Sequence, residues 1–151
     1  MTQKQAILSL LLALLSYFNS SAQNSADDMA AKFFDIYKTY GSDKAIDYIY
    51  STNKYSSENL EGVDEVKGSL RKALTLYGNY WGYDLITKKM AGENFVMMTF
   101  LVKYDRVPIT FRLLFYKPHD KWQVQNFKFD NKMDDELEEA SKAIKFKSNL
   151  E

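Results

Sequence analysis

Three charged residues lie in or beside apolar segments of this 151-residue chain, and they are the first candidates for chemistry. Asp84 follows the aromatic segment 80–83, Arg112 stands inside an apolar segment, and Asp130 follows another. A carboxyl group in an apolar pocket has a raised pKa, which brings it into a range useful for proton transfer. An arginine in such a place can bind a ligand carboxylate. The alternatives are that Asp84 faces water on an edge strand, and that Arg112 lays its stem along the sheet with its head solvated or paired.

The sequence contains none of the common catalytic or ligand-binding motifs: no nucleophile elbow, phosphate-binding loop, zinc-protease motif or calcium loop. Its one histidine, His119, falls in a predicted hairpin turn, which indicates a solvated residue rather than a metal ligand or a triad member. There is no cysteine for a disulfide, a thiol nucleophile, a metal site or a lipid anchor. We therefore expect no metal and no cofactor. Twenty basic residues balance twenty acidic ones, so a nucleic-acid partner is not expected.

Residues 1–22 have the three parts of a secretory signal peptide: a charged start at Lys4, an apolar core at 7–15, and small residues before a cut after Ala22. The apolar core is shorter than the ~20 residues that span a bilayer. An uncleaved anchor or a buried amphipathic helix is the alternative. We expect an exported protein, periplasmic or secreted, cleaved near Ala22, with residues 23–151 forming a single domain.

Apolar residues recur with helical spacing in four segments. Ser25 and Ser42 are expected to cap the first two helices, and Gly41 and Gly78 to end the first and third. A polar loop without periodicity is expected at 51–59. The predicted helices are Asp27–Tyr40, Asp43–Tyr50, Leu60–Tyr77 and Met133–Phe146.

Four segments between the third and last helices alternate in the manner of β-strands joined by short turns. The second strand is apolar on both faces, which predicts a central strand covered on both sides. In the fourth, the apolar positions change parity near Gln125 and Asn126, which predicts a bulge. The strands expected are Tyr80–Met90, Asn94–Tyr104, Val107–Lys117 and Trp122–Asp130. The fold class is therefore α+β: N-terminal helices packed on a curved four-stranded antiparallel meander, with a C-terminal helix.

This order of elements, ending in a strand of the type KWQVQNFKF, resembles the nuclear transport factor 2-like (cystatin-like α+β) superfamily over Asp27 to Asp130. The helix at Met133–Phe146 is an addition to the layout of that superfamily. The resemblance implies a cone whose mouth can hold a small apolar ligand. It also implies that, in an enzyme of this type, an acid such as Asp84 pointing into the cone would act as a general base.

Three functions stay open at this point. The first is a non-enzymatic exported domain that binds a small apolar or amphipathic ligand in the cone; an aromatic pocket with a few polar groups is typical of a ligand site. The second is an interaction module that forms a homodimer through its sheet face, since tyrosines suit interfaces equally well. The third is a small enzyme with Asp84 as base. The predicted ligand-binding residues are Tyr77, Trp81, Tyr83, Asp84, Phe100, Arg112 and Tyr116.

Overall fold

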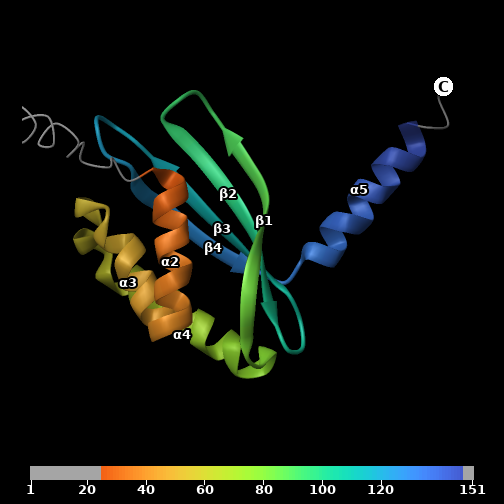
Figure 1. The fold of residues 1–151 in the computed structure, drawn as a ribbon, viewed down its shortest axis with the longest axis horizontal. Coiled ribbons are helices and arrows are strands. Elements are labelled where there is room, and N and C mark those ends of the chain that lie inside the picture. The colour runs from red at the N-terminus through yellow and green to blue at the C-terminus, as the bar shows by residue number, and fades with distance from the viewer. Residues whose placement is uncertain (1–24, 148–151) are drawn as a thin grey trace, which may run out of the picture.

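Helices, a four-stranded sheet and a last helix follow one another along residues 25–147, the part of the chain that the computed structural model describes. Helices α2 and α3 lie against one face of the sheet, α4 lies at one end, and α5 projects from the opposite side (Figure 1). This is the predicted α+β fold. The predicted signal peptide lies outside the described residues. No described helix is both long enough and apolar enough to cross a bilayer.

Helix α2 (Ala26–Tyr40) begins at a capping box, in which Ser25 and Asp28 bond each other's backbone N–H groups. Gly41, at φ +87°, ends it. Ser42 was expected as the cap of the next helix, but it is the first residue of α3 (Ser42–Ser51), and the preceding glycine provides no side-chain cap.

The segment predicted as a polar loop contains a 3₁₀ helix, η2 (Lys54–Asn59), so that expectation was wrong. The side chains of Asn53 and Asn59 accept backbone hydrogen bonds at its start and just beyond its end, where α4 (Leu60–Tyr77) begins. These local bonds stabilise a turn structure that apolar periodicity cannot indicate.

The strands pair in the antiparallel order β1-β2-β3-β4, as a simple meander. Their bounds are β1 (Tyr80–Met90), β2 (Phe95–Tyr104), β3 (Ile109–Tyr116) and β4 (Gln123–Asp130). The register of β4 shifts at Gln125, which confirms the predicted bulge. Two further irregularities, at Trp81 and Ile86, interrupt the pairing of β1. Next to the β4 bulge, the Thr52 hydroxyl accepts from the Val124 N–H at 2.9 Å.

The covered face of the sheet, which packs against α2 and α3, carries alternate residues of the strands, among them Val96, Phe100, Phe111 and Phe127. The open face carries the residues between them. Pairing aligns these in four rows across the sheet: Asp84–Leu101–Thr110–Asp130, Thr87–Thr99–Arg112–Lys128, Lys89–Met97–Leu114–Asn126 and Phe95–Tyr116–Gln123.

The prediction that β2 is covered on both sides was wrong for the described residues. Its covered-face residues are buried. On the open face Thr99 is also buried, but Phe95, Met97 and Leu101 stay partly exposed. Helices α2 and α3 lie on the other side and α4 lies at one end. The first turns of α5 (Met133–Lys147) border the open face with Met133, Glu136 and Leu137. An apolar surface on a central strand is therefore left without a covering layer from residues 25–147.

Candidate functional site

The space between the helices and the covered face is filled by aromatic rings. Phe33, Phe34 and Phe111 are almost fully buried and contact one another edge-on or stacked at centroid distances of 5.0–6.3 Å. Tyr83 stacks on Phe34 at 3.7 Å, and Phe100 meets the same ring edge-on at 4.9 Å. Such contacts are those of a packed core. Tyr83 and Phe100, both predicted ligand-binding residues, are thus engaged in this core.

Three tyrosines add polar groups to one end of the core. The hydroxyls of Tyr37 and Tyr104 are hydrogen-bonded to each other, and the Tyr80 ring contacts both residues. Burial raises the pKa of Tyr37 to about 12 and that of Tyr80 to about 12, and it raises the pKa of Tyr104 further. These phenols therefore stay neutral at physiological pH, and the contact of Tyr37 with Tyr104 joins α2 to β2.

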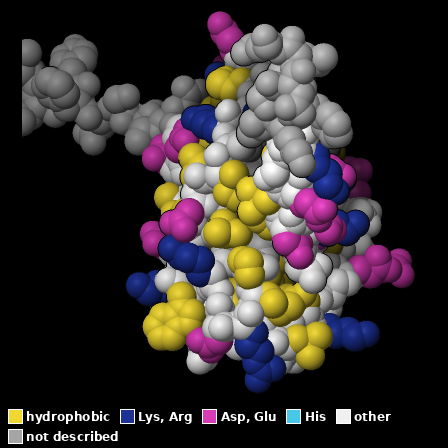
Figure 2. Space-filling model, turned by 90° about the vertical axis from the view of Figure 1, so that its right-hand side faces the viewer, with side chains coloured by type: hydrophobic (Ala, Val, Ile, Leu, Met, Phe, Trp, Pro, Cys, Tyr) yellow, Lys and Arg dark blue, Asp and Glu magenta, His cyan; other side chains and the backbone are white. Residues whose placement is uncertain are grey.

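The open face combines an apolar centre with charges, several of which are paired within the chain. Figure 2 shows hydrophobic side chains running down the middle of this side of the molecule, with charged ones on both flanks. The partly or largely exposed apolar residues on or beside it are Ile86, Phe95, Met97, Leu101, Leu114 and Tyr116. Contiguous apolar surface of this kind marks an interaction site or a ligand groove.

Arg112 lies at the centre of the charged groups of the open face. Its guanidinium donates to Asp130 and to Glu136 of α5. Burial lowers the pKa of Arg112, but the hydrogen bonds and charges of the two carboxylates outweigh it, so the net shift is upward. Both acids compete for the group that a ligand carboxylate would need. The predicted alternative, an arginine with its stem on the sheet and its head paired, is the arrangement in the structure.

Asp84, the candidate base, lies on edge strand β1 and points to the open face. Its side chain is 61% exposed and pairs with Lys103 at 3.1 Å. The dry, apolar pocket that would favour proton transfer does not surround this carboxylate. Asp130, the weaker candidate, is held by Arg112 and accepts from the Lys132 N–H at 3.0 Å.

The remaining predicted residues are scattered. Trp81 is exposed at the β1 edge, where its indole N–H donates to Asp105 at 2.5 Å. Tyr77 ends α4 near Tyr104, and Tyr116 lies in the last row of the open face. The seven predicted residues therefore lie on both sheet faces, on one sheet edge and at the end of α4, and they do not surround one cavity. His119 is exposed in the β3–β4 hairpin, as predicted.

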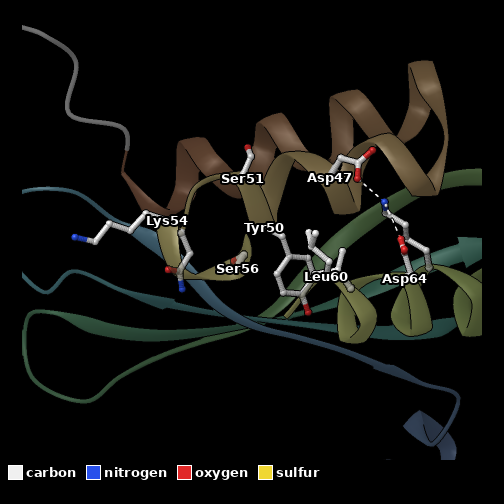
Figure 3. Close-up of a pocket in the computed structure, with 10 residues that line it drawn as sticks. Asp47, Tyr50, Ser51, Lys54, Ser56, Leu60 and Asp64 are labelled. Atoms are coloured by element: carbon white, nitrogen blue, oxygen red, sulfur yellow. Dashed lines mark ion pairs between the residues drawn. The ribbon is translucent and has the colours of Figure 1, made fainter. Parts of the chain in front are cut away.

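A groove of about 340 Å³ lies on the helical side, between α3, η2 and α4 (Figure 3). Lys67 on its wall pairs with Asp47 at 2.5 Å and with Asp64 at 3.6 Å. The ammonium group is thus already neutralised by two carboxylates. Tyr50 and Leu60 supply apolar surface next to these charges. Within residues 25–147, no three histidine, aspartate or glutamate side chains gather as they would around a metal ion.

A second hollow, of about 400 Å³, lies where α5 leaves the open face. Met97, Thr99 and Arg112 form its floor, and Met133 and Leu137 of α5 form one wall. Reasoning from single residues missed this surface, because none of its apolar members is chemically unusual. The sequence feature that indicates this surface is the second apolar face of β2.

No family model, no curated protein and no solved structure matches this chain. The resemblance to the nuclear transport factor 2-like superfamily therefore stays a prediction.

Proposed function

We propose that this protein is an exported, non-enzymatic interaction module that forms a homodimer through its open sheet face. The observation that carries the proposal is the apolar open side of the central strand β2, which α2, α3 and α4 do not cover. The filled core gives less support to a ligand held between helices and sheet, and the solvated Asp84 gives less support to an enzyme.

A second copy suits this face better than an unrelated charged partner. Arg112 is satisfied by two carboxylates, and Lys103 pairs with Asp84. The centre of the face therefore requires no complementary charge from outside, and burying it leaves these ions paired. In a two-fold interface the same surface serves on both sides, so the apolar centre of each copy is buried by the other copy.

The test is the mass of the purified protein in solution, measured by analytical ultracentrifugation over a range of concentrations. We expect a dimer. We expect Leu114→Asp, at the centre of the open face, to weaken it at least ~100-fold. Each copy then loses a buried leucine side chain, worth roughly 1.5–3 kcal/mol, and buries a carboxylate instead.

The matched control is Leu76→Asp, an exposed leucine of α4 away from the sheet face, which should leave the dimer intact. Circular dichroism must show that both variants are folded. A monomeric wild type, or a Leu114→Asp variant that dimerises normally, would overturn the proposal. Native mass spectrometry of the same samples distinguishes the ligand-binding alternative, because a retained small molecule on a monomer would favour it.

A further inference from the structure

Helix α5 begins on the open face and then leaves it. Its first turn is held by the ion pair of Glu136 with Arg112, and Met133 and Leu137 border the sheet. Beyond this contact the helix projects away from the domain (Figure 1). Side chains 134–142 are all exposed, and Leu137 is 62% exposed. The sheet of its own chain therefore does not bury the apolar stripe of α5.

The sequence of α5 is built to lie on a surface. At 100° per residue, Met133, Leu137, Ala140 and Ser141 form one stripe. Glu136 lies on one flank of this stripe, and Asp134 and Glu138 lie on the other. A helix of 15 residues is marginal in water without tertiary packing. A stripe between acidic flanks thus fits an apolar surface with cations on both sides.

The open face provides such a surface. Lys89 on β1 and Lys128 on β4 stand on the two edge strands, in neighbouring rows on either side of Met97 and Leu114. Neither lysine makes an ion pair with another residue of the described range. The lysines lie along the two margins of the apolar centre, as the acidic flanks of an overlying helix would require.

We propose that α5 of each copy crosses to the other copy and lies over its open face between Lys89 and Lys128, so that the dimer is closed by two exchanged helices. This rests on the proposed dimer and names the element that seals it. The exchange places the part of the α5 stripe beyond Leu137, with Ala140 and Ser141, on Met97 and Leu114 of the partner. The pair of Glu136 with Arg112 holds the start of each helix at the boundary between the two sheets.

Cysteine cross-linking tests the exchange, since the natural chain has no cysteine of its own. Ser141→Cys on α5 and Leu114→Cys on the open face are prepared as two single variants, mixed, and oxidised at a concentration where the wild type is dimeric. We expect covalent heterodimers of one chain of each kind. Lys72→Cys, exposed on α4, replaces Leu114→Cys in the control mixture and should give no specific product.

The double variant Ser141→Cys with Leu114→Cys separates the remaining outcomes. The exchange is overturned if the double variant forms an intrachain disulfide, the protein is a dimer by mass, and the mixed single variants give no covalent heterodimer. That result would leave the proposed dimer standing. A wild type that is monomeric at every concentration would overturn both. Charge reversal adds an independent readout: Lys128→Glu should weaken the dimer about tenfold, and a partner chain carrying Glu138→Lys should restore it. Failure of that rescue in a mixture that does form dimers would also count against the exchange.

Discussion

The paired phenols of Tyr37 and Tyr104 predict a loss of stability in alkali. Tyr37 is 6% exposed, and its pKa rises from 10.0 in the unfolded chain to about 12 in the folded protein because burial disfavours the phenolate. The folded state therefore holds this proton more tightly. Its contribution is complete below pH 10 and is lost as the pH rises from 10 to 12. A difference of two pKa units corresponds to about 2.7 kcal/mol, a large part of a typical 5–15 kcal/mol.

The assay is urea unfolding at a series of pH values up to about pH 12, on the wild type and on Tyr37→Phe. At neutral pH the variant should be less stable by about 1 kcal/mol, because it loses one hydrogen bond. Between pH 10 and pH 12 it should lose less stability than the wild type, by up to about 2.7 kcal/mol, since its ring cannot ionise. Tyr40→Phe, at a 71% exposed position of the same helix, should follow the wild-type curve. If the gap between Tyr37→Phe and wild type is constant with pH, the assignment of a buried neutral phenol is refuted.

Two further predictions concern packing and the hydrogen bonds at β4. Leu70→Ala should lower the free energy of unfolding by about 2–5 kcal/mol in denaturant titrations, because Leu70 is fully buried; Leu76→Ala on the same helix, 63% exposed, should change it by less than about 0.5 kcal/mol. Thr52→Val should cost about 1–3 kcal/mol by the same measurement, because it leaves the Val124 N–H without its acceptor. The same replacement at exposed Thr39 should be nearly neutral, and equal losses at both threonines would contradict this account.

The sequence defined most elements because their ends carry strong local signals. The bounds predicted for α4 and β1 are those observed, since Gly78 takes a φ of +87° that ends the helix just before the strand. The 3₁₀ helix η2 was missed because it depends on two asparagine side chains and not on a repeating apolar pattern. Side chains alternate along β1, so Asp84 and Tyr83 point to opposite faces of the sheet. Which of the two faces the helices cover depends on packing between distant segments, and therefore the sequence left the candidate site undecided.

The two edges of the sheet differ from its open face in a way that limits assembly. An edge strand with free N–H and C=O groups is a template for further strands and hence for fibres. Beside the β4 bulge, Thr52 and Asn53 occupy both backbone polar groups of Val124. On β1 the irregularities at Trp81 and Ile86 break the continuous ladder that an added strand would need. Growth in the plane of the sheet is thus disfavoured at both borders, and the proposed association through the broad side would yield a closed, finite particle.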